Sequence, residues 1–168
     1  MKMKILIVVI SFSVSVLGVL GVTVSQDKAV RRSAAAQKVR NAVESRCYTI
    51  SVDMMQPRSM PPRSLDYGYG VRVAGDSVYS CLPYAGRAYS VPYGGGRALR
   101  FDGLIRSYSA QRKRKNRIVV TLSVANDEDT YTYTFNIYDS GNASVVVQPV
   151  NREGISFTGN IDTPEIIK

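Results

Sequence analysis

The 168-residue sequence contains no histidine and no tryptophan, and it has only two cysteines. Without histidine the chain cannot form a Ser-His-Asp or Cys-His catalytic site, and it has no side chain that shuttles protons near neutral pH. Two cysteines without histidine cannot form a structural zinc cluster. We therefore expect neither a metal nor another cofactor, and we predict that the protein is not an enzyme.

The composition that remains is typical of one folded domain. Hydrophobic residues make up 45% of the chain, which is enough to fill a single core. The formal net charge is +9, but residues 26–117 carry 18 basic and 6 acidic residues whereas residues 118–168 carry 2 basic and 7 acidic ones. Because the two parts can compensate each other within one fold, net charge alone is weak support for a polyanionic partner.

The N-terminus has the order of a secretory signal peptide. Met1–Lys4 is basic, Ile5–Val22 is apolar and uncharged, and the next residues are small and polar. We predict that residues 1–25 are a signal peptide cleaved near Ser25-Gln26, and that the protein is exported to the periplasm or the cell surface. An uncleaved anchor is the alternative, because 18 apolar residues approach the length that crosses a bilayer. In that case the leader would be the protein's only membrane contact.

The two cysteines have two interpretations. The first interpretation is a disulfide between neighbouring strands, because Cys47 and Cys81 are an even pair in a chain predicted to reach an oxidising compartment. Two buried free thiols are the other.

Hydrophobic periodicity predicts one helix followed by strands. Residues 26–46 contain no glycine or proline and are rich in alanine and basic residues, which predicts a basic helix. From Cys47 the apolar residues alternate, with a proline-rich loop over Met55–Leu65. We predict a mainly β domain over residues 47–162, an antiparallel meander of about eight strands that forms a small barrel or a sandwich. Residues 163–168 form a C-terminal tail.

The segment Leu82–Arg97 concentrates three tyrosines, two arginines, two prolines and four glycines in sixteen residues. Exposed tyrosine rings beside guanidinium groups suit stacking on sugar rings and pairing with carboxylate or phosphate. The alternative is an ordered connection whose rings cover one end of the barrel. The candidate ligand-binding residues are Tyr84, Arg87, Tyr89, Tyr93 and Arg97.

A second candidate is a run of five basic residues in six, consisting of Arg112, Lys113, Arg114, Lys115 and Arg117. The run predicts contact with a polyanion, such as envelope glycolipid, acidic polysaccharide or anionic membrane. The alternative is a solvated hairpin tip. No aromatic residue interleaves with the run, so we predict no nucleic-acid partner.

Acidic residues offer two further candidates. The turn Asn126–Asp129 clusters oxygen ligands but lacks the pattern of a helix-loop-helix calcium site, so we expect a solvated turn. Asp53 and Asp102 are the acids within strand-like stretches, and a hydrolase would need both of them in one cleft.

The motifs Leu82-Pro83-Tyr84, Gly86-Arg87-Ala88-Tyr89 and Pro92-Tyr93-Gly94-Gly95 resemble the signature of a family of unknown function. Its members are small exported proteins common in Bacteroides-type bacteria. The leader, the basic helix and the closing strand Ile155–Gly159 follow the family's order. The resemblance implies a bacterial periplasmic or surface location and a mainly β domain, and it supplies no activity, substrate or catalytic residue.

Together these features predict an exported, non-enzymatic β domain that binds an envelope component or a small ligand through Tyr84–Tyr93. One alternative is an interaction or scaffolding protein tethered to the membrane by its leader. A weaker alternative is a carboxylate-dependent hydrolase. The sequence makes no prediction of the oligomeric state.

Overall fold

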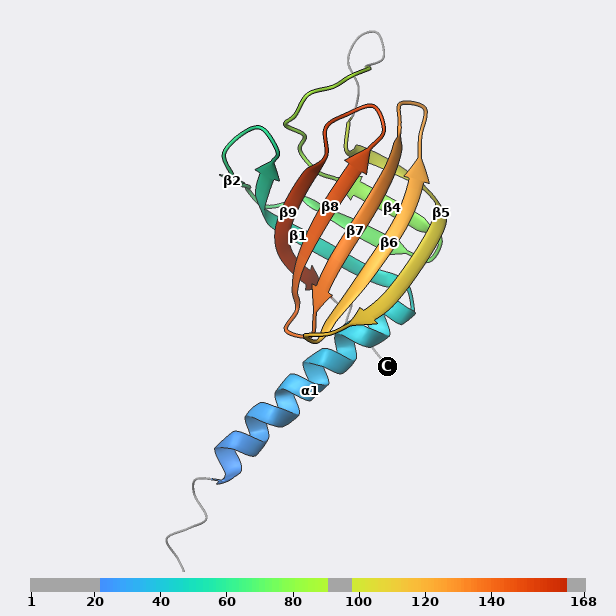
Figure 1. Ribbon diagram of the computed structural model, residues 1–168. Helices are drawn as coiled ribbons and strands as arrows, with labels where there is room; N and C mark the ends of the chain where they lie inside the picture. The colour runs from blue at the N-terminus through green and yellow to red at the C-terminus, as the bar shows by residue number, and fades with distance from the viewer. Residues whose placement is uncertain (1–21, 91–97, 163–168) are drawn as a thin grey trace, which may run out of the picture.

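The computed structural model describes residues 22–90 and 98–162, and Figure 1 shows their arrangement. Within these ranges one helix precedes nine strands, where the sequence pattern predicts one helix and about eight strands. They are α1 (Val22–Glu44), β1 (Cys47–Pro57), β2 (Arg63–Ser64), β3 (Gly70–Ala74), β4 (Ser77–Cys81), β5 (Arg100–Lys113), β6 (Arg117–Ala125), β7 (Thr130–Tyr138), β8 (Asn142–Pro149) and β9 (Ile155–Asp162). The mainly β prediction is confirmed.

Eight of the strands close into an antiparallel barrel. The order is β1-β3-β4-β5-β6-β7-β8-β9, and β9 pairs back onto β1. Closure depends on the length of β1, because its first half pairs with β3, its second half pairs with the two-residue β2, and β9 pairs along its other side. Of the two predicted architectures, the barrel is the one that forms, with β2 as an added outer strand.

Alternating side chains fill the barrel. The inward positions of β6 and β7 are all buried, and they are Ile118, Val120, Leu122, Val124, Tyr131, Tyr133, Phe135 and Ile137. The hydroxyl of Tyr133 donates a 3.0 Å hydrogen bond to Ser80 Oγ, which supplies its polar tip with a partner inside the core. Burial raises the pKa of Tyr133 well above its usual range, so this tyrosine stays neutral and acts as core.

The barrel wall bends where strand register shifts. One shift lies between Val52 and Met54 of β1, opposite Gly159 of β9. A Cβ at Gly159 would overlap the carbonyl oxygen of Ser51, so only glycine allows the two strands to approach this closely. A second shift lies between Ile105 and Ser107 of β5.

Helix α1 closes one end of the barrel with its last turns only. Ala36, Val39, Ala42 and Val43 are buried, while residues 27–35 are all exposed on the part that extends away from the barrel in Figure 1. The Tyr108 hydroxyl lies 3.2 Å from the Val43 carbonyl oxygen and fastens the helix to β5. No helix in residues 22–90 and 98–162 is long and apolar enough to span a membrane. The predicted leader lies mostly outside this described part, as does the predicted tail 163–168.

The predicted loop Met55–Leu65 is partly wrong. β1 continues to Pro57, which pairs with Ile155, and Arg63–Ser64 forms β2. Proline is tolerated at Pro57 because it is the last residue of the strand.

The disulfide interpretation of the cysteines is wrong, and the alternative is confirmed for the free thiols but wrong about their burial. Cys47 and Cys81 are free thiols, and both are exposed because they alternate with inward-facing residues of β1 and β4. Their strands flank β3 rather than each other, and the two cysteines pair with its opposite ends, Ala74 and Gly70. Their Cα atoms are separated by four residue steps of about 3.4 Å along the strands and by two strand spacings of about 4.8 Å across them. This separation is too large for a disulfide, which needs Cα atoms within about 7 Å of each other.

Candidate functional site

An open groove of about 1010 Å³ lies on the outer surface of the barrel, across β1, β3, β4 and β5. We call it the outer groove. Its floor is a row of small outward-facing side chains that pair across three strands, Ser51, Gly70 and Cys81. A Cβ at Gly70 would approach the Ile50 carbonyl oxygen to 2.6 Å, so the sheet itself requires glycine here. Three small residues in register leave a hollow where larger side chains would fill the surface.

One wall of the outer groove is the next row of the same strands. Arg72 pairs with Tyr79, and Tyr79 pairs with Asp102. The Arg72 guanidinium lies 4.3 Å from the centroid of the Tyr79 ring, a cation–π contact that orients both side chains on the surface. This wall presents an aromatic face beside a positive and a negative group.

The opposite wall is the segment between β2 and β3, which is fixed to β1 at both ends. The backbone N–H of Leu65 donates to the Asp53 carbonyl at 2.8 Å, and the N–H of Val52 donates to the Tyr69 carbonyl at 3.0 Å. Between these anchors Tyr67 is fully exposed. The Arg100 guanidinium lies 5.8 Å from the Tyr69 ring centroid and links this wall to β5. The groove therefore has two walls that both carry tyrosine.

Asp53 and Asp102, the acids that the hydrolase alternative requires, both line the outer groove. β3 and β4 lie between the strands that carry them, so three strand spacings of about 4.8 Å separate their backbones. The paired carboxyl groups of glycosidases stand roughly 5 to 10 Å apart. Asp53 and Asp102 share a groove but do not have the spacing of a hydrolytic pair.

We call the segment Leu82–Arg97 the Tyr-Arg segment, and the structure places its Tyr84 at the mouth of the barrel, where the half-buried ring packs on the core. Its hydroxyl lies 2.9 Å from the Arg87 carbonyl oxygen and 3.0 Å from that of Glu153. The Arg152 guanidinium lies 5.8 Å from the ring centroid, and burial raises the pKa of Tyr84. The ring of Tyr84 therefore covers one end of the barrel, as the alternative for this segment proposed.

Arg87 and Tyr89 lie close to Tyr84 in the chain and are both exposed, and Tyr89 is 71% exposed. Their backbones are tied to the β8–β9 connection, since the N–H of Glu153 donates to the Arg87 carbonyl at 2.8 Å and the N–H of Tyr89 donates to the Asn151 carbonyl at 2.8 Å. Tyr93 and Arg97, the other two candidate residues, lie outside the described residues.

Glu153 holds the Tyr-Arg segment through its carboxylate as well. Ser59 Oγ donates to it at 2.7 Å and the Arg87 N–H donates at 3.3 Å, and these bonds lower the pKa of Glu153. Because folding lowers the pKa of Glu153, its carboxylate holds these hydrogen bonds at any pH above the ordinary pKa of a glutamate. The bonds are lost as the pH falls through the lower pKa that Glu153 has in the folded protein. We expect the Arg87 and Tyr89 amide signals in ¹H–¹⁵N spectra to broaden as the pH falls below the ordinary range of a glutamate carboxyl.

The matched variants for this titration are Glu153→Gln and Asp127→Asn. Glu153→Gln is expected to remove the pH dependence of these amide signals, and Asp127→Asn, at an exposed acid of a nearby turn, is expected to leave it unchanged. If the spectra of Glu153→Gln titrate as the wild type does, another group anchors the segment.

Asp129 corrects the expectation of a solvated acidic turn. It is only 5% exposed and accepts hydrogen bonds from the backbone N–H groups of Thr130, Val150 and Asn151 at 2.7 to 3.1 Å. The carboxylate therefore joins the β6–β7 turn to the β8–β9 connection. In the described part of the chain no three carboxylate or thiol groups are arranged to hold a metal ion.

The basic run occupies the turn between β5 and β6, as predicted for a hairpin tip. Lys115 and Asn116 have positive φ angles of 66° and 50°, the left-handed conformation of a tight hairpin turn. Residues 112–116 are all exposed.

Sequence reasoning missed the residues of the outer groove, which are Tyr67, Tyr69, Arg72, Tyr79 and Arg100. A signal for them exists, since Arg72 and Tyr79 alternate with the inward-facing residues of their strands and therefore place a cation and an aromatic ring on the outer surface. Their convergence depends on register between separate hairpins, which periodicity within one strand does not reveal.

Comparison with known proteins gives a family and a fold. The sequence model of the family described as "Domain of unknown function (DUF4251)" matches residues 31–161. Among solved structures, the chain is similar to the crystal structure of a DUF4251 family protein from Bacteroides eggerthii, with a TM-score of 0.56 and 14% sequence identity, over 77% of this chain and 90% of that one. The curated proteins gave no significant sequence match.

Proposed function

Since the chain belongs to the DUF4251 family, a domain family of unknown function, we propose its function from the geometry of its surface. The barrel is a non-catalytic carbohydrate-binding domain, and the outer groove is its binding site. Tyr67 and Tyr79 stack against sugar rings from opposite walls. Arg72, Arg100 and Asp102 exchange hydrogen bonds with the hydroxyl groups.

The observation that carries the proposal is the pair of tyrosine-bearing walls around a floor of small residues. Tyrosine presents a large apolar face with a polar tip, which matches a sugar ring with its C–H faces and peripheral hydroxyls. Guanidinium groups provide several donors in a fixed plane, and carboxylates provide acceptors. The groove is open along the surface, so it suits a chain of sugars better than a small enclosed ligand.

The Tyr-Arg segment supports this site from one side. Its neighbours Cys81 and Arg100 line the outer groove, and Leu82 is held to Leu99 by a 3.2 Å backbone hydrogen bond. Arg87 and Tyr89 are exposed and extend the surface available to a ligand, whereas Tyr84 serves the barrel mouth. With export as predicted from the leader, the ligand would be a glycan of the bacterial envelope.

The test is binding of the purified protein to an array of bacterial envelope oligosaccharides, followed by calorimetry on the best binder. Combined Tyr67→Ala and Tyr79→Ala replacement is expected to weaken the affinity at least tenfold, because each stacked aromatic contributes about 1 kcal/mol. Tyr138→Ala, at an exposed tyrosine on the other end of the barrel, is the matched control and is expected to bind normally.

Tyr89→Ala separates the outer groove from the Tyr-Arg segment. A loss of affinity in Tyr89→Ala with none in the Tyr67 and Tyr79 double variant would place the ligand on the segment and contradict the groove. Absence of any glycan binding would contradict the proposed function itself.

A further inference from the structure

The fold brings together two basic segments that are about eighty residues apart in the sequence. One is the exposed part of α1 and the other is the β5–β6 hairpin, and both lie at the end of the barrel that α1 closes. We call this surface the basic end. Its basic residues are Lys28, Arg31, Arg32, Lys38, Arg40, Arg112, Lys113, Arg114, Lys115 and Arg117.

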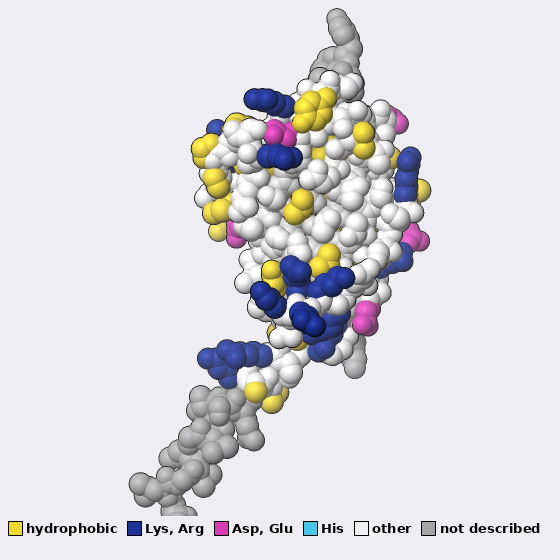
Figure 2. Space-filling view, viewed as in Figure 1, with side chains coloured by type: hydrophobic (Ala, Val, Ile, Leu, Met, Phe, Trp, Pro, Cys, Tyr) yellow, Lys and Arg dark blue, Asp and Glu magenta, His cyan; other side chains and the backbone are white. Residues whose placement is uncertain are grey.

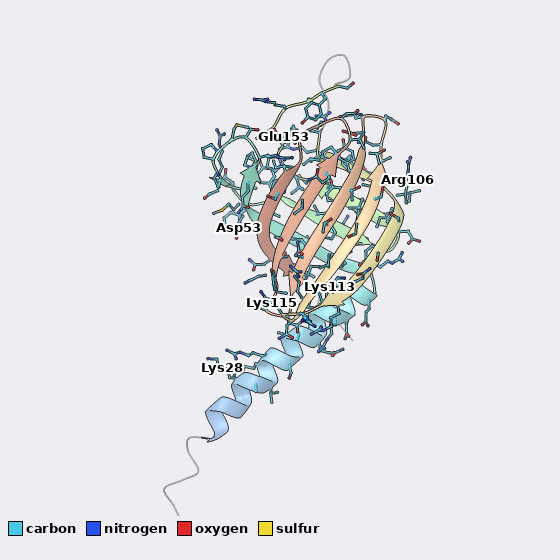
Figure 3. The ribbon with its side chains drawn as sticks, viewed as in Figure 1. Lys28, Asp53, Arg106, Lys113, Lys115 and Glu153 are labelled. Atoms are coloured by element: carbon cyan, nitrogen blue, oxygen red, sulfur yellow. The ribbon has the colours of Figure 1, made fainter. Side chains whose placement is uncertain are left out.

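The two segments face a common groove. Lys28, Arg31 and Arg32 line it from α1, and Lys115 and Asp139 line it from the hairpin and the neighbouring β7–β8 turn; its volume is about 890 Å³. Figure 2 shows Lys and Arg side chains gathered where α1 meets the barrel. In Figure 3, Lys28 extends from α1, and Lys113 and Lys115 lie at the adjacent end of the barrel, opposite the end that carries Glu153.

Positive charge at the basic end is only partly compensated. Its ten basic residues stand against five acidic residues at this end of the barrel, Asp27, Glu44, Asp76, Asp139 and Asp162, and Asp76 pairs with Arg46. Asp139 pairs with Arg112 at 2.8 Å, and within residues 22–90 and 98–162 the other nine basic residues form no ion pair. Like charges held this close repel one another, and this repulsion is relieved when an anionic surface supplies the opposite charge.

The exposed half of α1 also has no protein partner in the described part of the chain. Residues 27–35 are all exposed, and the buried positions begin only at Ala36. An isolated helical segment of this length is marginally stable in water, so its packing is incomplete without a further surface.

We propose that the basic end is a docking surface for a bilayer of anionic phospholipid. In the chain that keeps its leader, the uncharged apolar stretch Ile5–Val22 leads directly into α1, and Lys28 follows Val22 by six residues, about 9 Å along a helix. The stretches 27–40 and 112–117 contain no aromatic residue, and Tyr138 is the one aromatic residue that lines the groove, so the surface does not offer the series of stacking groups that single-stranded nucleic acid uses. Basic residues beside an apolar segment are the arrangement that anionic headgroups attract.

Docking through the basic end sets the orientation of the barrel. The outer groove lies over the first residue of β3, the last residue of β4 and the first residue of β5, while the basic hairpin follows the last residue of β5. The groove and the hairpin are therefore toward opposite ends of the barrel, and the groove stays open to solvent when the basic end contacts lipid.

The experiment measures binding of the full chain to vesicles of phosphatidylcholine alone and to vesicles with 30% phosphatidylglycerol. The ratio of the two partition coefficients isolates the charge-dependent part of the binding, because the apolar leader contributes equally to binding of both kinds of vesicle. Two triple variants test the two segments: Lys28→Gln, Arg31→Gln and Arg32→Gln on α1, and Lys113→Gln, Arg114→Gln and Lys115→Gln on the hairpin. Glutamine preserves helix propensity at exposed positions.

We expect the wild-type ratio to exceed about 100, and to fall with added salt. Each triple variant is expected to lower binding to anionic vesicles by about 100-fold and leave binding to neutral vesicles unchanged. The matched control removes three exposed arginines elsewhere, Arg58→Gln, Arg63→Gln and Arg106→Gln, and is expected to bind as the wild type does. Circular dichroism verifies that each variant is folded.

Three results would overturn the proposal. One is a wild-type ratio near one, another is a control variant that loses as much binding as the two triple variants, and the third is tighter binding to a DNA duplex than to anionic vesicles at the same salt concentration. The third result would assign the basic end to nucleic acid. Glycan binding by the outer groove is measured separately, so either proposal can fail while the other stands.

Discussion

Replacing Phe135 with alanine is expected to lower the free energy of unfolding by about 4 kcal/mol, the largest effect of any single substitution considered for this barrel. Phe135 is fully buried at the centre of β7, with ring centroids of Tyr133 and Tyr48 at 6.0 and 6.3 Å. Strands on every side prevent the wall from collapsing into the cavity that alanine would leave. Since domains of this size are stable by about 5 to 15 kcal/mol, the variant would be close to unfolding. Urea denaturation followed by circular dichroism measures the loss.

The matched control is Phe135→Leu, which keeps most of the volume and is expected to cost less than about 1.5 kcal/mol. A loss below about 1 kcal/mol for Phe135→Ala would contradict a closed, tightly packed barrel interior, because it would mean that the neighbouring side chains can fill the space.

Replacing Gly159 with alanine is expected to cost about 3 kcal/mol, although it adds a single methyl group. The new Cβ would overlap the carbonyl oxygen of Ser51 and lie 2.7 Å from the Cα of Val52, so backbone rather than a flexible side chain would have to move. The clash lies at the β1–β9 pairing that closes the barrel. Thermal and urea denaturation measure the change in stability.

Gly154→Ala is the control for this prediction. A Cβ at Gly154 would meet the amide end of Gln148 at 2.7 to 2.9 Å, and an exposed glutamine side chain can swing away. We expect a cost below about 1 kcal/mol. Equal losses for the two alanine variants would show that the loss of glycine, and not the approach of β9 to β1, determines the stability.

Several elements were predictable because their determinants are local. The strict alternation of β7 predicts its buried face, and the structure buries all four inward residues, Tyr131, Tyr133, Phe135 and Ile137. The hairpin between β3 and β4 turns at Gly75, a glycine with a φ of +61° followed by an aspartate. Local turn chemistry and side-chain period encode such features within about ten residues of chain.

The errors concern contacts between distant residues. The sequence allows a disulfide between Cys47 and Cys81, but in the structure β3 lies between the strands that carry them. The acidic turn was expected to be solvated, but Asp129 is buried against the β8–β9 connection, twenty residues later in the chain. Neither arrangement follows from neighbours in sequence, because both depend on which strands meet and in what register.

The sequence by itself determined the mainly β class, the single N-terminal helix and the exclusion of histidine-dependent catalysis, because composition and side-chain period are properties of the chain alone. Only the tertiary structure decided between barrel and sandwich, since closure requires β9 to pair with β1 across more than a hundred residues. It also assembled the outer groove from separate strands and gathered the basic end from α1 and the β5–β6 hairpin. Surfaces of this kind arise from register and packing, and these are set only when the whole barrel forms.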